Sequence, residues 1–414
     1  MEATPTIKTE MKWGHGVHRI LFLYWFLFVI WQNVSVGSLH GSMDVIVKMG
    51  LLAMLVCYYL FHTVQVNTMH LLAVLALSAV LLATLSRETS LTVQIILMYV
   101  FPVVLALLCY VLGDDSCVSR QEYQQYMDWI IWTVLYMALY SLIFQTHKFT
   151  AALSVHQAYG NQLRSFLGSN HEYAMYLMFA MCACITGLSQ IGLSRRKPQF
   201  YYVTGALFAV NFILTFSRTA FLSFGVFLIC FVLIDRSPLQ RLVLILLAAA
   251  AVLVILYRPL RIYVFQVLLR SHVDAGRFRQ IEFALNKFQS GTWIQQLFGF
   301  GHSETNHFVR RVAHVRSIHN AYLQVLLTNG VVGLTVLLAV VLNNIVQGLR
   351  TIRTSRFYGA VFTGLALAAA CFMLTNTPVI FTSPIDCAML TFFAIILPKY
   401  VRNGFLEEQA GEQA

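Results

Sequence analysis

Long apolar stretches, separated by short polar connections, run along almost the whole chain. Many are close to the roughly 20 residues that a helix needs to cross a lipid bilayer, and several are somewhat shorter. The pattern therefore predicts an all-α, polytopic membrane protein with about 12 transmembrane helices. The predicted spans are residues 20–31, 43–61, 70–85, 91–112, 127–144, 172–193, 200–216, 219–234, 242–257, 319–346, 357–374 and 384–398.

The positions of Lys and Arg orient these spans, because short connections on the cytoplasmic side of a membrane are enriched in both residues. With twelve spans and both termini inside, the basic connections 194–199, 235–241 and 348–356 fall on the cytoplasmic side. The connections 32–42 and 375–383 carry no Lys or Arg, and they fall outside. The distribution of basic residues thus agrees with the predicted number of spans.

One external connection, residues 258–318, is much longer than the others. Connections above about 12–15 residues usually have structure of their own or a function. Apolar side chains recur at helical spacing from Phe278 to Phe288, which predicts a short amphipathic helix. We therefore expect one integral-membrane domain, residues 1–414, with a large and partly helical extracytoplasmic cap loop.

Composition agrees with a membrane protein and adds a positive charge. Hydrophobic residues make up 58% of the 414 residues, charged residues 11%, and the net charge is +11. A soluble domain has about 45–50% apolar residues. The loop 258–318 alone carries nine basic and three acidic residues, a net +6, so either a long loop tolerates this charge or it binds an anionic partner. The eight cysteines include no Cys-x-x-Cys pair, and we expect no metal site or disulfide framework.

A His and an Asn stand at the outer edge of the predicted span 319–346. In a regular helix from His319, Gly330 and Gly333 would lie within roughly 40° of the His azimuth, at about 100° per residue. Small residues there would permit close helix packing that holds the His in place. His319 is a candidate general base, and the alternative is an interfacial His beside an ordinary glycine pair. Asn320 is a candidate for orienting a substrate hydroxyl or for capping the helix.

Four further residues, in three segments, fall on the same predicted side of the membrane. Arg218 stands between two apolar runs, where an Arg usually has a functional partner unless it extends its charge to the interface. Arg277 and Arg279 open the amphipathic segment, and a helix start with guanidinium groups suits a phosphate, although a solvated basic face has the same pattern. Asn170 enters a span from outside, either as a substrate-positioning residue or as a helix cap.

The combination of these segments resembles the superfamily of O-antigen ligases and O-antigen polymerases, which are integral-membrane glycosyltransferases. The stretch HNAYLQVLLTNGVVG, residues 319–333, is similar to the family signature of His, a small polar residue, nine residues, Gly, two residues and Gly. FSRTAFL around Arg218 is similar to the family's Ser-Arg-Thr segment. GRFRQIEFA, followed by LFGFGHSETN, is similar to the start of its large external loop. The resemblance covers about residues 166–333.

The resemblance implies en bloc transfer of a glycan from undecaprenyl pyrophosphate to an acceptor sugar hydroxyl, in the biosynthesis of O-antigen, lipopolysaccharide or capsule. The implied location is the bacterial cytoplasmic (inner) membrane, with the active site on its extracytoplasmic face. No metal or cofactor is expected, and the predicted outer segments contain no Asp-x-Asp for a divalent ion. Arginines would stabilise the departing pyrophosphate, and His319 would accept the proton of the attacking hydroxyl, which implies inversion. The expected partners are the lipid-linked donor, a glycan or lipid-linked acceptor, membrane lipid and a candidate chain-length regulator, with no nucleic acid.

Ligases and polymerases share the donor chemistry, so these residues do not separate the two activities. The compact outer loops and the ending FTSPIDCAML resemble polymerases slightly more. Leu334 and Thr335 follow Gly333, where ligases often have a Thr-Trp-like ending. A lipid-linked oligosaccharide flippase is the alternative from another class, since it also uses internal arginines, but it needs neither an external His base nor a one-sided cap.

Overall fold

The part of the chain that the computed structural model describes consists of helices and irregular connections, without strands. It comprises residues 19–27, 29, 40–61, 68–88, 91–107, 120–153, 162–167, 169–189, 197–258, 261–262, 264–265, 277–313, 318–374, 376, 397–398 and 401–402. The helices are α2 (His40–Leu60), α3 (Thr68–Leu85), α4 (Val93–Ala106), α5 (Arg120–Phe144), α6 (Thr146–Leu153), α7 (Asn170–Ser189), α8 (Pro198–Leu214), α9 (Arg218–Ile234), α10 (Pro238–Leu256), α12 (Arg277–Gln289), α13 (Trp293–Phe298), α14 (His302–Ala313), α15 (Ala321–Thr351) and α16 (Arg356–Met373).

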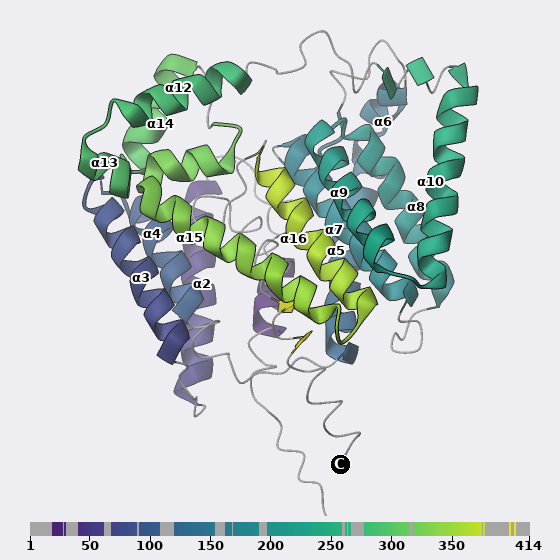
Figure 1. Ribbon diagram of the computed structural model, residues 1–414, viewed down its shortest axis with the longest axis horizontal. Coiled ribbons are helices and arrows are strands. Elements are labelled where there is room, and N and C mark those ends of the chain that lie inside the picture. The colour runs from purple at the N-terminus through teal and green to yellow at the C-terminus, as the bar shows by residue number, and fades with distance from the viewer. Residues whose placement is uncertain are drawn as a thin grey trace, which may run out of the picture.

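The helices form two groups that α15 connects (Figure 1). Helices α5, α7, α8, α9 and α16 pack into the main bundle, with α10 at its edge, and α2, α3 and α4 form the second group. Helix α15 contacts α3 near one of its ends and packs along α16 toward the other. The three short helices α12, α13 and α14 lie over one end of the second group and the start of α15, and we call them the cap.

Burial within the main bundle follows from how many neighbours each helix has. Helix α7 lies among α5, α8, α9 and α16, and every side chain from Tyr173 to Cys184 is buried. Helix α10 is apolar on all sides but buries no side chain. A helix that is hydrophobic all round needs an apolar surrounding, so α10 indicates that lipid is the solvent of this surface.

Ten of the twelve predicted spans coincide with helices: α2, α3, α4, α5, α7, α8, α9, α10, α15 and α16. In the first predicted span, 20–31, the described residues 20–27 and 29 are helical as well. Among the described residues, five helices are long and apolar enough to cross a membrane, namely α5, α7, α10, α15 and α16. Shorter apolar helices occupy Met49–Leu60, Val74–Leu85 and Arg218–Ile234. The count of twelve therefore stays a prediction, and its last span, 384–398, lies almost wholly outside the described residues.

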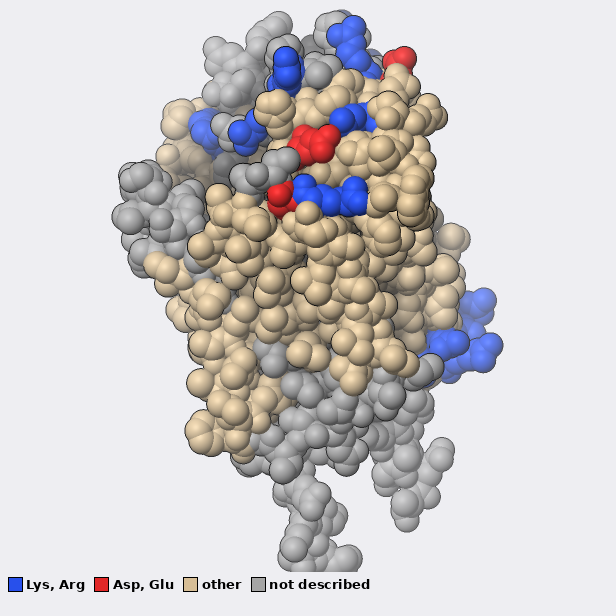
Figure 2. Space-filling view, turned by 90° about the vertical axis from the view of Figure 1, so that its left-hand side faces the viewer, with Lys and Arg blue, Asp and Glu red and all other residues tan. Residues whose placement is uncertain are grey.

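Charged residues are distributed unevenly along the molecule. Figure 2 shows Lys, Arg, Asp and Glu side chains at the cap end, a broad band of other residues below them, and a separate group of Lys and Arg at the lower right edge. The α15–α16 connection, with Arg350, Arg353 and Arg356, lies at the end away from the cap (Figure 1). The predicted cytoplasmic connection 348–356 and the cap are thus at opposite ends, as the orientation from Lys and Arg requires.

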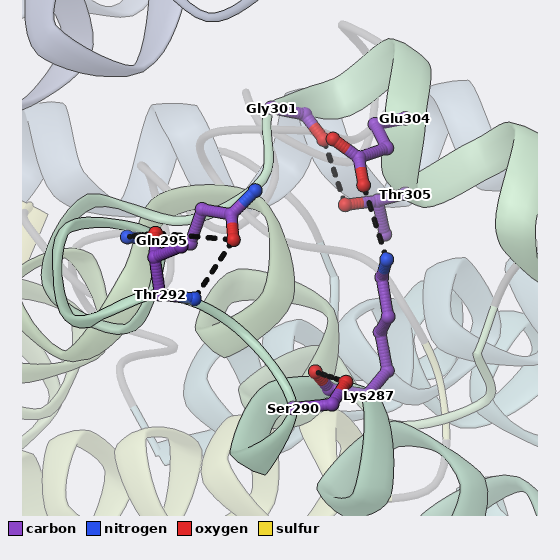
Figure 3. A network of polar contacts seen from close by, with 7 residues as sticks. All are labelled: Lys287, Ser290, Thr292, Gln295, Gly301, Glu304 and Thr305. Atoms are coloured by element: carbon purple, nitrogen blue, oxygen red, sulfur yellow. Dashed lines mark hydrogen bonds and ion pairs between the residues drawn. The ribbon is translucent and has the colours of Figure 1, made fainter.

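The cap contains more structure than the sequence pattern predicted. The amphipathic helix expected near 278–288 is confirmed as α12, whereas α13 and α14 were not predicted. Helix α13 is only six residues long, too short for an apolar repeat to stand out, whereas α14 is clearly amphipathic over its twelve residues and the sequence analysis did not single it out. Thr292 starts α13 through a reciprocal capping box with Gln295, which Figure 3 shows from close by.

A small core and one ion pair hold the cap helices together. The buried core consists of Ala284, Phe300, Val309, Ile318 and Leu327, with Phe288 and Leu323 packed against it. Lys287 of α12 pairs with Glu304 of α14 at 3.1 Å (Figure 3). The same Lys287 Nζ lies 4.6 Å from the ring centre of Phe300 and 4.8 Å from that of Phe308. These contacts make α12 and α14 one packed unit rather than a loose loop.

Two side chains, one in the last turn of α3 and one just after this helix, connect the cap to the second helix group. Thr84 Oγ1 donates to the carbonyl oxygen of Phe298 at 3.1 Å. The carboxylate of Glu88 accepts the backbone N–H groups of His302 at 2.5 Å and Ser303 at 3.0 Å, and also the hydroxyl of Tyr99. Glu88 therefore caps the N-terminus of α14 from a distant part of the chain, where a negative charge is favourable.

Glu88 gives the cap a pH-dependent contact. Burial alone would raise the pKa of the Glu88 carboxyl, but hydrogen bonds from Ser303, Tyr99 and His302 outweigh it and hold this pKa below its ordinary value. A carboxyl with a lowered folded pKa stabilises the fold above its unfolded pKa, about 4.3 for Glu. That contribution is lost as the pH falls through the lower, folded value.

Replacing Glu88 with Gln should therefore loosen the start of α14 at neutral pH, because the amide loses the charge. Loss of a helix cap typically costs about 1 kcal/mol, so amide exchange in the first turn of α14 should become about fivefold faster at pH 7. Hydrogen–deuterium exchange, corrected for intrinsic rates, measures this, and the wild type should approach the variant at acidic pH. Glu282→Gln on the exposed side of α12 is the control. Equal protection of wild type and Glu88→Gln at pH 7 would contradict this account.

Candidate functional site

The turn between α8 and α9 presents Arg218. Ser217 is the N-cap residue of α9, and Arg218 is its first helical residue. Thr215 and Ser217 in this turn are fully buried, whereas Arg218 is half-buried. Phe216 between them has a φ of 53°, a left-handed conformation that is uncommon for residues other than glycine. The turn is thus a fixed and specific structure, with the arginine at its outer edge.

The first turn of α7 is hydrogen-bonded to this same α8–α9 turn. Asn170 Nδ2 donates to the carbonyl oxygen of Thr215 at 2.9 Å. The Nδ1 atom of His171 lies 2.8 Å from the hydroxyl oxygen of Ser217. The structure therefore brings the predicted residues Asn170 and Arg218 into one cluster. His171 was not predicted as a site residue, and its only signal in the sequence is its place beside Asn170.

Helix α12 carries the two other predicted arginines at its start. Arg277 is its first residue, and Arg279 is exposed in its first turn. The next residue, Gln280, is only 8% exposed, and its Oε1 accepts the backbone N–H of His319 at 3.2 Å. The structure therefore connects the basic start of α12 with His319, through a residue that the sequence pattern did not single out.

His319 lies half-buried in a short bend directly before α15. Asn320 is the N-cap residue of α15, since its Oδ1 accepts the backbone N–H of Leu323 at 3.0 Å. The N–H of Asn320 itself donates to the carbonyl oxygen of Ile318 at 2.7 Å. The capping function considered for Asn320 is thus present, and its role in positioning a substrate stays a prediction.

Helix α15 is not one regular helix, because it kinks at Gly330. This residue has φ 69° and ψ −168°, a conformation open essentially to glycine alone. A Cβ atom on Gly330 would lie 2.2 Å from the carbonyl oxygen of Leu297 in α13. A Cβ atom on Gly333 would meet Asn329 of its own helix at 2.2 Å. The predicted alignment of His319 with both glycines on one straight stripe is therefore wrong, because the kink interrupts the helix that it assumed.

The cap is hydrogen-bonded to the backbone of α15 just before the kink. The N–H of Phe300 donates to the carbonyl oxygen of Leu327 at 2.7 Å, and the N–H of Gly301 donates to that of Thr328 at 3.2 Å. Gly299 permits the close approach, since a Cβ atom there would lie 2.1 Å from the Thr328 carbonyl oxygen and its φ is 85°. Residues 318–329, from the bend at His319 to the kink, are thus packed against the cap at both ends.

The two clusters lie toward the same end of the molecule. Helix α9 runs from the Arg218 turn to its connection with α10, and α10 runs back and ends level with the cap (Figure 1). The α8–α9 turn is therefore on the cap side of the main bundle. Among the described residues, no group of three or more His, Cys, Asp or Glu side chains is arranged to hold a metal ion.

Comparison with known families gives one match. Residues 203–338 match the sequence model of the O-antigen ligase family, and they extend from α8 to the middle of α15. The matched part, about a third of the chain, contains the candidate residues Arg218, Arg277, Arg279, His319, Asn320, Gly330 and Gly333, and it excludes Asn170. No curated protein matches the chain.

Proposed function

By its match over residues 203–338, the chain belongs to the superfamily of O-antigen ligases and polymerases, and we propose that it transfers a glycan en bloc from a lipid pyrophosphate to an acceptor sugar hydroxyl. The observation that carries the proposal is the hydrogen bond between Gln280 and the backbone N–H of His319, because it joins the arginine-bearing start of α12 to the residue that carries the imidazole. Such a transfer needs a cation that stabilises the leaving group and a base that accepts the proton of the nucleophile.

The proposed reaction is a direct displacement at the anomeric carbon. The acceptor hydroxyl oxygen forms the new bond to this carbon while the bond to the pyrophosphate oxygen breaks, so the configuration inverts. His319 takes the hydroxyl proton, and the pyrophosphate leaves on its lipid. Arg218, Arg277 and Arg279 stabilise the developing negative charge through charge-assisted hydrogen bonds. In this proposal Asn170 and Asn320 position the substrates, and no metal takes part.

We favour a polymerase, which extends the glycan on a lipid carrier, over a ligase, which attaches it to a lipid A–core acceptor. The test is the glycan pattern of the native bacterium after deletion of the gene. A polymerase deletion should leave single repeat units on the final acceptor, whereas a ligase deletion should leave finished polymer on the lipid. Accumulation of donor in the cytoplasmic leaflet would instead indicate a flippase. With the purified protein, transfer that stops in excess chelator and returns with Mg²⁺ would indicate a metal-dependent transferase.

The proposed active face is extracytoplasmic, in the bacterial inner membrane. Gln289 ends α12 and is exposed, so a Gln289→Cys variant without reactive native thiols should react with a membrane-impermeant maleimide in intact cells whose outer layer admits the reagent. The control is Arg353→Cys in the connection at the opposite end, which should react only after the membrane is permeabilised. The reverse pattern would invert the orientation and overturn the site assignment.

Arg218 should act through its planar guanidinium group, which can donate two parallel hydrogen bonds, and not only through its charge. Arg218→Ala is expected to lower the transfer rate about 10²-fold, the typical effect of losing one donor to a developing anion. Arg218→Lys should recover only part of this loss, because an ammonium cannot bind two phosphate oxygens in the same way. Initial rates with lipid-linked donor from the deletion strain measure both variants. Arg236→Ala, an exposed arginine at the other end of α9, is the control. Wild-type rates for Arg218→Ala would leave this arginine as a surface charge.

A further inference from the structure

Gln280 is a long polar side chain on the buried face of α12. It is 8% exposed, and Ala284, one turn further along the same face, is 1% exposed. Its neighbour Arg279 is exposed, as is Glu282. Burying an amide without hydrogen bonds is unfavourable by a few kcal/mol. A glutamine at this position of the helix therefore needs a specific partner inside the cap.

The partner of Gln280 is the backbone of the candidate base. The amide Oε1 accepts the His319 N–H at 3.2 Å. On the other side, the N–H of Ile318 donates to Oε1 of Gln324 at 3.4 Å, and Asn320 caps α15. The backbone of residues 318–320 is thus fixed both from α12 and from α15. Loss of the Gln280 bond would remove the direct tie to α12.

The His319 segment packs against the cap, and the residues after it also contact the main bundle, where Tyr322 donates to the carbonyl oxygen of Ala370 in α16 at 3.1 Å. Ile318 and Leu327, which flank the segment, belong to the same buried core as Ala284 of α12 and Val309 of α14. The helix then turns away at Gly330. A shift of α12 would therefore be transmitted to His319 directly, with Gln280 as the hydrogen-bonded contact between them.

We propose that Gln280 is a positioning residue for glycan transfer, one that sets the backbone of His319, and so the direction of its imidazole, relative to the arginine-bearing start of α12. The inference rests on the proposed function. Gln280 lies one residue after Arg279 and three after Arg277, within the first turn and a half of the helix. Through this spacing, the Gln280 side chain connects the two arginines proposed to stabilise the leaving group with His319, the proposed base. Gln280 acts through His319 and does not itself exchange a proton.

The test compares two variants of Gln280 in the full-length protein in lipid nanodiscs. Gln280→Met keeps the length of the side chain and removes the acceptor, whereas Gln280→Glu keeps an acceptor oxygen at the same place. The probe is the lipid extract of the deletion strain, which supplies the lipid-linked glycan. Gln289→Met, at the exposed end of the same helix, is the matched control. Unfolding temperatures of all variants are measured in parallel.

The Met variant should lower kcat roughly 10–100-fold and leave KM for the extract within about twofold, because a misplacement of about 1 Å can cost 10²-fold in rate without weakening donor binding. The Glu variant should retain most of the wild-type kcat. A wild-type kcat for Gln280→Met would overturn the proposal, as would equal losses in both variants that follow their unfolding temperatures. The His319→Ala variant separates the positioning role of Gln280 from the proposed base. If His319→Ala is inactive while Gln280→Met is normal, only the positioning role fails. If His319→Ala is active, the proposed base fails too.

Discussion

Replacing His319 with Ala is expected to abolish glycan transfer while the protein still inserts and folds. A sugar hydroxyl is a weak nucleophile, and a positioned general base typically contributes about 10²–10⁴-fold to the rate. His319 is half-buried and does not belong to the buried core of the cap, and the segment around it is held through its backbone by the side chains of Gln280, Asn320 and Gln324. Removal of the imidazole should therefore affect the reaction far more than the fold.

Product formation and donor binding must be measured side by side for this variant. His319→Ala should bind the lipid-linked donor with near-normal affinity and form product at least about 10²-fold more slowly. His307→Ala on α14 is the control, because this His is exposed in the same cap. Near-normal turnover by His319→Ala would remove the imidazole from the chemistry and leave it as an interfacial side chain.

Replacing Gly330 with Ala should have the largest effect on the fold. The backbone at φ 69° and ψ −168° is disfavoured for any residue with a Cβ, at a cost of about 1–3 kcal/mol. The new methyl group would also meet the carbonyl oxygen of Leu297 at 2.2 Å, so α13 would have to move. We expect a lower unfolding temperature, faster amide exchange in α13, and loss of glycan transfer because the cap separates from α15.

Gly225 on α9 offers a matched control for this substitution. A Cβ atom there would meet nothing within 4 Å, so Gly225→Ala should be neutral or slightly stabilising, by up to about 1 kcal/mol in a helix. Differential scanning fluorimetry with exchange measurements compares the two variants. An unfolding temperature of Gly330→Ala equal to that of Gly225→Ala would show that α15 is straight at this position in the membrane.

The sequence predicted the helices where a regular pattern is long, and it missed structure that depends on distant contacts. Ten apolar runs and the amphipathic helix α12 were recognisable because side chains repeat along one segment. The kink at Gly330 was not, because Thr328, Asn329 and Gly330 form only a short interruption inside a long apolar run. Its cause lies about thirty residues earlier, in the approach of Leu297 and Gly299 to the backbone of α15.

The candidate site was predicted as a set of separate positions rather than as clusters. Asn170 and Arg218 are joined through Thr215, whose carbonyl group carries no sequence signal. Gln280 reads as one polar residue of an amphipathic helix, and only the folded cap shows that it faces inward to His319. Glu88 follows an apolar run without any motif. Each omission is a hydrogen bond between elements, which local patterns do not encode.

The contacts of Thr84 and Glu88 with the cap also constrain the order of synthesis. Thr84 and Phe298 are 214 residues apart in the sequence, as are Glu88 and His302. Chains emerge from the ribosome N-terminus first, at about 5–20 residues per second, so α3 is synthesised roughly ten seconds or more before its partner in the cap exists. During this interval the carboxylate of Glu88 has not yet met the N–H groups of His302 and Ser303. A late step of assembly is then the docking of the cap onto the earlier segment that contains Thr84 and Glu88. Nascent chains stopped before residue 302 should expose Glu88 to reagents that the finished protein excludes.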